Sequence, residues 1–139
     1  MPHDDQSAFR IAPATELEEE RIHTLLRTHN ARHWPKDMPS LSFTARVEGE
    51  LAGGIVAYLV AGTVEVEYLF VQERFRGHGI ARALLARVES QAKEHGAKKI
   101  LLNTYGFQAP GLYRHLGFQE VATVDDVLGT SWHIFLKHI

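Results

Sequence analysis

One stretch of the sequence combines glycines and arginines in a pattern that can bind an anion. The run Arg74-Phe75-Arg76-Gly77-His78-Gly79 follows an apolar segment and precedes a helical one that starts at Ile80. The first turn of a helix has backbone N–H groups without intrahelical partners and lies at the positive end of the helix dipole. Glycines let a phosphate approach the backbone closely, and arginines add positive charge. The pattern predicts a diphosphate site; the alternative is a strand-to-helix turn that needs glycine only for its geometry.

The spacing around these glycines does not fit the common nucleotide-binding motifs. A P-loop requires Lys-Ser or Lys-Thr after its last glycine, whereas Ile80 and Ala81 follow Gly79. The dinucleotide fingerprint requires a third glycine three residues after Gly79, where this sequence has Arg82. ATP, GTP and NAD are therefore poor candidate ligands.

A pair of carboxylates and the set of histidines are the other groups that could do chemistry. Glu65 and Glu67 lie two residues apart in a segment that has the pattern of a strand, so both side chains are expected on one face of a sheet. Such carboxylates can act as general bases, can attract a cationic substrate, or can be ordinary surface residues. Among the nine histidines no pair has the His-x-x-x-His spacing on a predicted helix, and there is no cysteine. The sequence therefore predicts no metal site, no disulfide and no cysteine nucleophile.

The length and composition predict a single domain over residues 1–139. Hydrophobic residues make up 45% of the chain, and the formal net charge of -2 shows no basic excess that would favour nucleic acid. No apolar run reaches the roughly 18 residues that a membrane span needs. The N-terminal segment also lacks the pattern of a signal peptide, so a cytoplasmic location is expected. Residues 1–8 are polar and expected to be loose.

The hydrophobic periodicity predicts helices and strands that together form a mixed sheet. A short strand is expected at residues 9–12, followed by a helix that starts with the capping box Thr15–Glu18 and continues to about Asn30. Alternation from Leu41 and two glycine-containing turns predict three antiparallel strands that end at Val71. The remaining predicted elements are a helix over 80–95, a strand over 98–105, a short helix at 110, and strands near 118–124 and 131–137. The order β-α-β-β-β-α-β-α-β-β indicates an α/β (α+β) fold.

Two motifs resemble those of the GNAT superfamily of N-acetyltransferases. The first motif lies at the start of the longest helix. It consists of Gln or Arg, any two residues, Gly, any one residue, and then Gly or Ala, and it matches residues 74–79. The second is a short helix that ends in a tyrosine just before Leu-Gly-Phe, and it matches residues 109–118. Residues 107–110 and 135–137 resemble a branch of small, single-domain bacterial-type members. The resemblance covers nearly the whole chain and implies a central mixed, mostly antiparallel sheet of six to seven strands with helices on both faces.

The resemblance implies that acetyl-CoA is the cosubstrate and that no metal takes part. The backbone amides from Arg76 to Ala81 would hold the pyrophosphate, and Arg82 would lie near it. The preceding strand would pair with the pantetheine arm. Many members have an asparagine where this chain has Gly106. The contact that this asparagine makes would be absent here or would be made instead by Gln108 or Asn103. The cofactor-binding residues expected on this basis are Leu69, Phe70, Val71, Arg74, Arg76, Gly77, His78, Gly79, Ile80, Ala81, Asn103 and Gln108.

The same resemblance implies roles for the catalytic residues. Tyr113 takes the position of the general acid that protonates the departing thiolate, although a tyrosine there could also be a core residue. An alkyl ammonium cannot attack while protonated, so an amine acceptor needs a base. Glu67 is the first candidate for this base and Glu65 the second, and either would act directly or through water. His33 and Trp34, in a proline-broken segment, would contact the acceptor.

The implied reaction is direct transfer of the acetyl group to a primary amine of a small molecule. The alternatives are an acetyltransferase for lysine side chains or N-termini of proteins and peptides, and a non-catalytic acyl-CoA-binding sensor. The resemblance also implies that the chain can form a homodimer.

Overall fold

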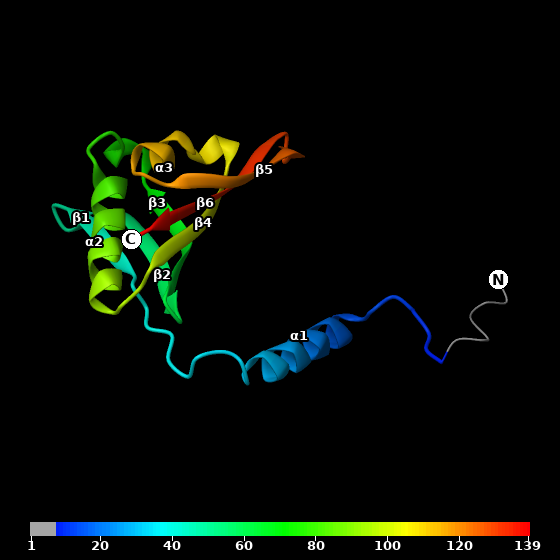
Figure 1. Ribbon diagram of the computed structural model, residues 1–139. Coiled ribbons are helices and arrows are strands. Elements are labelled where there is room, and N and C mark those ends of the chain that lie inside the picture. The colour runs from blue at the N-terminus through cyan, green and yellow to red at the C-terminus, as the bar shows by residue number, and fades with distance from the viewer. Residues whose placement is uncertain (1–7) are drawn as a thin grey trace. The chain divides into compact units, whose positions relative to one another are not determined.

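The computed structural model describes residues 8–139, and the chain divides after Trp34 into two units. The first unit contains α1 (Glu16–Asn30), which begins with the predicted capping box (Figure 1). Thr15 Oγ1 accepts a hydrogen bond from the Glu18 backbone N–H at 3.2 Å, and the Glu18 carboxylate accepts one from the Thr15 N–H at 2.9 Å. The box satisfies two N–H groups that have no intrahelical partner, which is why the helix begins at this position.

The predicted strand at residues 9–12 is wrong. These residues have no regular structure, and no backbone hydrogen bond joins them to a strand of the described chain. Three apolar residues gave the pattern of a short strand, but a strand forms only where a neighbouring strand pairs with it. The expectation that residues 1–8 are loose concerns positions that, except for Ala8, lie outside the described residues.

The second unit contains a six-stranded sheet with the order β1-β2-β3-β4-β6-β5 (Figure 1). Its strands are β1 (Phe43–Val47), β2 (Glu50–Val60), β3 (Thr63–Val71), β4 (Lys99–Tyr105), β5 (Gln119–Val127) and β6 (Thr130–His138). The β3–β4 pair is parallel and every other pair is antiparallel. The predicted mixed, mostly antiparallel sheet is therefore confirmed, without the expected first strand.

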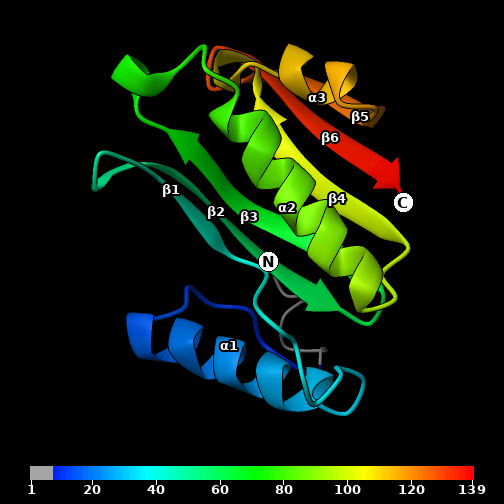
Figure 2. The same cartoon turned by 90° about the vertical axis from the view of Figure 1, so that its left-hand side faces the viewer.

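Two helices of this unit lie on one face of the sheet. In Figure 2, α2 (Ile80–Glu94) runs across that face. The short helix α3 (Gly111–His115) connects β4 to β5, and both crossovers advance in the same direction across the sheet. Right-handed crossovers of this kind place their helices on the same face. A helix on the opposite face stays a prediction, because α1 belongs to the other unit. Within residues 8–139, no helix combines the length and apolar character needed to cross a membrane.

The core lies between these helices and the sheet. The largest fully buried side chains are Phe135, Ile55, Ile100, Val64 and Val88. Along β4, the residues at positions 100, 102 and 104 are buried, so every second side chain faces the helices. Tyr113 of α3 belongs to the same buried cluster as the apolar face of α2. The core therefore connects both helices to the central strands.

The central strands β3 and β4 stay paired over only part of their length (Figure 2). Thr63, Val64 and Glu65 pair with Lys99, Ile100 and Leu101, and the two strands then continue without further pairing to Val71 and Tyr105. On its other side, β3 contains a bulge. Val56 of β2 is opposite Tyr68 and the next residue, Ala57, is opposite Val66, so Glu67 is the additional residue. A bulge bends its strand and increases the local twist, which moves the second half of β3 away from β4.

Ile100 gives a test of this core, because it lies in the paired part of β4 and is 1% exposed. Replacing Ile100 with Ala should lower the free energy of unfolding by about 2–5 kcal/mol, since it removes apolar contacts and leaves a cavity. Val121, on β5, is 54% exposed. The control Val121→Thr should change stability by less than about 0.5 kcal/mol. Urea denaturation of both variants measures this, and equal effects would contradict the described core.

Candidate active site

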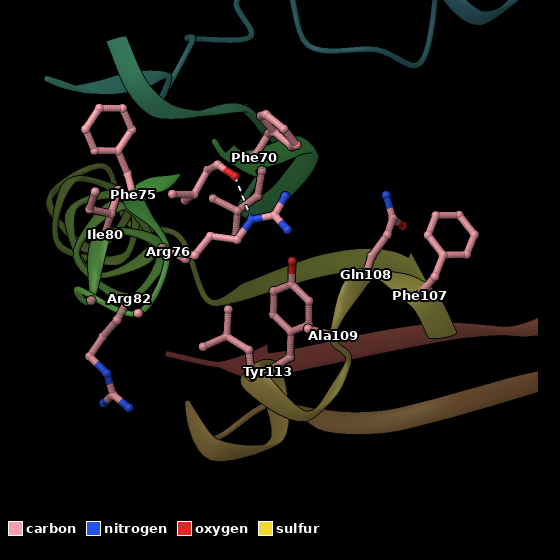
Figure 3. Close-up of a pocket in the computed structure, with 15 residues that line it drawn as sticks. Phe70, Phe75, Arg76, Ile80, Arg82, Phe107, Gln108, Ala109 and Tyr113 are labelled. Atoms are coloured by element: carbon pink, nitrogen blue, oxygen red, sulfur yellow. Dashed lines mark hydrogen bonds between the residues drawn. The ribbon is translucent and has the colours of Figure 1, made fainter. Parts of the chain in front are cut away.

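A cavity of about 580 Å³ lies where the end of β3, the start of α2 and the segment from 107 to 113 meet (Figure 3). Most of the residues predicted to bind a cofactor line it, namely Leu69, Phe70, Val71, Arg76, Gly77, Gly79, Ile80, Ala81 and Gln108. Tyr113 lines the same cavity. The fold therefore brings the two sequence motifs, which begin at Arg74 and Ala109, to the walls of one cavity.

The glycine turn exposes the N-terminus of α2 to this cavity. Gly77 and Gly79 have φ angles of +83° and +80°, in the left-handed region where residues with a Cβ are strained. Gly79 is the N-cap of α2 and provides no side-chain cap, and no acidic residue lies in the first turn. The backbone N–H groups at the start of α2, with the partial positive charge of the helix dipole, are consequently available to an anion.

The two arginines of the motif have different surroundings. Arg76 Nε donates a hydrogen bond to the carbonyl oxygen of Val71 at 2.9 Å, and its guanidinium lies 5.5 Å from the centre of the Phe70 ring. These contacts hold the Arg76 side chain across the cavity (Figure 3). Arg74 instead forms an ion pair with Glu50 and lies over the ring of Phe75. Neither Arg74 nor His78 lines the cavity, so their predicted contacts with a cofactor stay predictions.

Tyr113 is both a core residue and a residue of the cavity. Its ring packs against Phe118 and Phe135, with ring centres 5.8 Å and 5.6 Å away, and the residue is 7% exposed. Its hydroxyl points into the cavity (Figure 3). Burial raises the pKa of this hydroxyl above its ordinary value of 10.0, because the phenolate would lose hydration. Tyr113 therefore keeps its proton at neutral pH and can donate it.

The predicted bases lie in a second cavity, of about 480 Å³. Glu65 and Glu67 line it together with Asn103 and Trp132, and the indole N–H of Trp132 donates to the Asn103 side-chain oxygen at 3.4 Å. Asn103, predicted to bind the cofactor, thus lies with the two carboxylates and not with Tyr113. Consecutive parts of β3 line both cavities: residues 65–68 the second and residues 69–71 the first. The β3 residues of the two cavities follow one another along the strand, and of these only Glu65 is paired with β4.

A family model and several relatives match this chain. The model of the acetyltransferase (GNAT) family matches residues 6–118, which is most of the sequence. The chain belongs to the GNAT family. It is 36% identical over 93 residues to Blasticidin-S acetyltransferase of Streptomyces morookaense, covering 66% of this chain and 68% of that protein. It is 31% identical over 119 residues to acetyltransferase Atu2258 of Agrobacterium fabrum, covering 84% of this chain and 87% of that protein.

A solved structure agrees with this assignment. The crystal structure of an acetyltransferase from Bacillus cereus is 30% identical and superimposes with a TM-score of 0.81, over 94% of this chain and 98% of that one. The resemblance inferred from the two motifs is confirmed, and the protein is a GNAT-type acyltransferase.

This GNAT acetyltransferase has Gly106 at the position where many family members have an asparagine, and the structure explains why a small residue is present there. A Cβ at position 106 would lie 2.3 Å from Thr130 Oγ1 and 3.0 Å from Ser131 Oγ, so any larger residue requires these hydroxyls to move. Gln108, the proposed replacement, accepts hydrogen bonds from the Tyr105 N–H at 2.9 Å and from Thr104 Oγ1 at 3.3 Å. Its side-chain oxygen therefore stabilises the turn after β4, at the edge of the first cavity.

Sequence reasoning did not identify several residues that line the cavities. Phe107 lines the first cavity and stacks on Tyr105, with ring centres 5.5 Å apart. Trp132 and Ile134 line the second, because the register of β4 with β6 places Ile134 opposite Asn103 and Trp132 two residues away on the same face. The period-two pattern of β6 shows only that they share a face. His33 and Trp34 belong to the first unit, and their predicted contact with an acceptor stays a prediction.

The glycine turn can be tested through backbone strain. Gly79→Ala should lower the free energy of unfolding by about 1–2 kcal/mol, because an L-residue with a Cβ is unfavourable in the left-handed region. No atom lies within 4 Å of a Cβ added at Gly79, so steric overlap does not contribute. Gly111→Ala is the matched control: a Cβ there also meets nothing within 4 Å, and its φ is not in the left-handed region. The control should be neutral or stabilise by about 0.4–1 kcal/mol. Urea denaturation compares the two, and an unaffected Gly79→Ala variant would contradict the left-handed turn.

Proposed function

We propose that this GNAT acetyltransferase transfers the acetyl group of acetyl-CoA to a primary amine of a small molecule. GNAT acetyltransferases use acetyl-CoA, and the family membership supports that donor here. The observation that carries the proposal is the position of the two cavities. One combines an anion-binding helix N-terminus with a buried phenol, and the other, adjacent along β3, contains two carboxylates.

The residues of the first cavity fit the chemistry of acetyl-CoA. The turn at Gly77 and Gly79 and the first N–H groups of α2 match a diphosphate, and Arg76 and Arg82 add positive charge. Next to this anion site, β3 has no strand partner on its β4 side from Val66 onward among the described residues. Its backbone groups can therefore bind the amides of the pantetheine arm as an added strand would.

Bound acetyl-CoA supplies the acetyl group as an activated thioester. Tyr113 holds a proton at a hydroxyl that faces the cavity, and it can give this proton to the thiolate that leaves. The backbone N–H groups of the unpaired part of β3 are donors for the oxyanion that develops on the acetyl carbon. No covalent enzyme intermediate is required, and the chain has no cysteine to form one.

The second cavity supplies the base and the acceptor site. An amine enters as an ammonium ion, which the carboxylates of Glu65 and Glu67 attract, and it must lose a proton before it attacks. We assign this step first to Glu67, because along β3 it is nearer than Glu65 to residues 69–71, which line the first cavity, and next to Glu65. Either carboxylate can act directly or through water.

Two observations favour a small molecule as the acceptor. The second cavity has a volume of about 480 Å³, within the range typical of small-molecule sites, about 300–1,000 Å³. In addition, the relative from Streptomyces morookaense has blasticidin S in its name as the substrate. Trp132 and Tyr68 offer aromatic surface beside the carboxylates, which suits a cationic amine.

The acceptor class is tested by measuring CoA thiol release with a panel of small cationic amines and a matched panel of peptides with free lysines or N-termini. We expect turnover with one or more small amines and none with the peptides. Acetyl-CoA and CoA should raise the melting temperature, with about 2.7 kcal/mol of stabilisation at 100 times the dissociation constant, whereas ATP and NAD should not. Turnover of peptides alone would identify a protein acetyltransferase. A shift with CoA but no turnover would identify an acyl-CoA sensor.

The role of Tyr113 predicts both a rate and a pH dependence. Tyr113→Phe should lower kcat about 100-fold, because it removes the proton donor, and should change KM for acetyl-CoA less than about twofold. A general acid must be protonated. Since burial raises the pKa of Tyr113 above 10.0, kcat of the wild type should not fall until the pH exceeds that value. Measuring kcat from pH 7 to 11 tests this, and the Phe variant should lack the alkaline decline. Full activity of the Phe variant would exclude Tyr113 as the acid.

A further inference from the structure

Three elements of the second unit meet at one carboxylate that lines neither cavity. Glu120, on β5, accepts a hydrogen bond from Arg114 Nη2 at 2.9 Å through its Oε2 atom. Its Oε1 atom accepts a hydrogen bond from Thr123 and contacts His133 Nδ1. Arg114 belongs to α3 and His133 to β6, so Glu120 connects three elements that are separate in the sequence.

This network contacts Phe135, one of the two rings that pack against Tyr113. His133 is 7% exposed, and its ring stacks on Phe135 with ring centres 6.0 Å apart. The guanidinium of Arg114 lies 5.6 Å from the centre of the same Phe135 ring, from which the Tyr113 ring is also 5.6 Å away. Phe135 is therefore in contact with two of the three partners of Glu120 and with Tyr113.

The helix that carries Tyr113 needs such contacts. α3 has five residues and no side-chain cap at its N-terminus, and a helix of this length is not stable by itself. Its orientation must come from packing and from bonds to other elements. Arg114, the residue after Tyr113, is the member of α3 that bonds to Glu120, so this bond acts next to the candidate acid.

Glu120 is ionised at neutral pH. Hydrogen bonds from Thr123, His133 and Arg114 lower its pKa from 4.5 to about 2. The bond from Arg114 is thus charge-assisted, which makes it shorter and stronger than a bond between neutral groups. A carboxylate with three donors is also held in one orientation, and it restricts the orientation of each donor.

We propose that Glu120 is a positioning residue for acetyl transfer, which holds α3 against β5 and β6 through Arg114 and His133 and thereby fixes the Tyr113 hydroxyl in the first cavity. The inference rests on the proposed role of Tyr113 as the general acid. Glu120 itself touches none of the reacting groups and acts through α3.

The same residues have the connectivity of a nucleophilic triad, since Ser131 Oγ lies 2.7 Å from His133 Nε2 and Glu120 contacts His133 Nδ1. A nucleophile must reach its substrate, however, and Ser131 lines neither of the two cavities. Ser131 is only half-buried, but a Cβ added at Gly106 would lie 3.0 Å from its Oγ, so the turn after β4 lies beside this hydroxyl. The arrangement therefore favours a positioning role for the network.

A double-mutant cycle tests this inference. Glu120→Gln is made in the wild type and in the Tyr113→Phe variant, and kcat and KM are measured with acetyl-CoA and the most active amine of the panel. In the wild type, kcat should fall about tenfold, because a small displacement of a catalytic group has a large effect on rate. KM for acetyl-CoA should change less than about twofold. In the Phe variant, Glu120→Gln should have no further effect on kcat, because the group that it positions is already absent.

The other outcomes of the cycle are distinct. An equal loss of kcat in both backgrounds would show a general structural role and would overturn the inference, as would an unchanged kcat in the wild type. If Tyr113→Phe by itself keeps full kcat, the general-acid role fails, and the positioning role fails with it.

A matched control separates positioning from stability. The carboxylate of Glu89, on α2, binds Lys137 at 2.9 Å and Lys93 at 3.3 Å, and it is about as exposed as that of Glu120, 23% against 27%. Glu89 lines neither cavity. Glu89→Gln should lower the melting temperature by an amount similar to Glu120→Gln but leave kcat unchanged.

A second variant covers the case in which Glu120→Gln does not fold. Arg114→Gln removes the bond from α3 to Glu120 and the contact of the guanidinium with the Phe135 ring, and it leaves the contact between Glu120 and the buried His133. The Arg114 side chain is 48% exposed, so this change is mild. It should reproduce the loss of kcat in the wild type and the absence of an effect in the Phe variant. A folded Arg114→Gln enzyme with full kcat would overturn the inference.

Discussion

The limited pairing of β3 with β4 is the constraint on which the rest of the site depends. Only three residue pairs join these parallel strands, and the bulge at Glu67 then bends β3 away. Had the pairing continued, the backbone groups of residues 69–71 would be used within the sheet. Because it stops, the end of β3, the first turn of α2 and the segment before α3 can line a common cavity. The hydrogen bonds that the sheet gives up become available to a ligand.

The charges around the two cavities complement this geometry. The first cavity has the N-terminus of α2, without an acidic residue in its first turn, and the side chains of Arg76 and Arg82. The second has Glu65 and Glu67. Opposite charges on two adjacent cavities favour an anionic ligand in one and a cationic ligand in the other. A donor that carries phosphates and an acceptor that carries an ammonium group would consequently be directed to different sides of the same strand.

The position of Tyr113, the proposed general acid, depends on contacts outside its own short element. Five residues of α3 cannot define an orientation by helix formation alone. The ring of Tyr113 is instead packed between Phe118 and Phe135, and the neighbouring Arg114 is bonded to Glu120. The hydroxyl at the far end of the ring remains open to the cavity. Core packing and the polar network thus act on the ring and its neighbour, while the proposed chemistry would take place at the hydroxyl.

The sequence by itself determined the features that depend on neighbouring residues. The capping box of α1, the glycine turn before α2, the alternation that begins at Leu41 and the tyrosine motif of α3 all involve residues a few positions apart, where backbone geometry decides which side chains meet. The tertiary structure decided the features that depend on strand partners and register. Residues 9–12 have the composition of a strand but no partner among the described strands. Asn103 joined Glu65, Glu67 and Trp132, and Glu120 met Arg114 and His133 from six and 13 residues away. Strand register and bulges cannot be read from local patterns, because a shift of one residue moves every side chain to the other face.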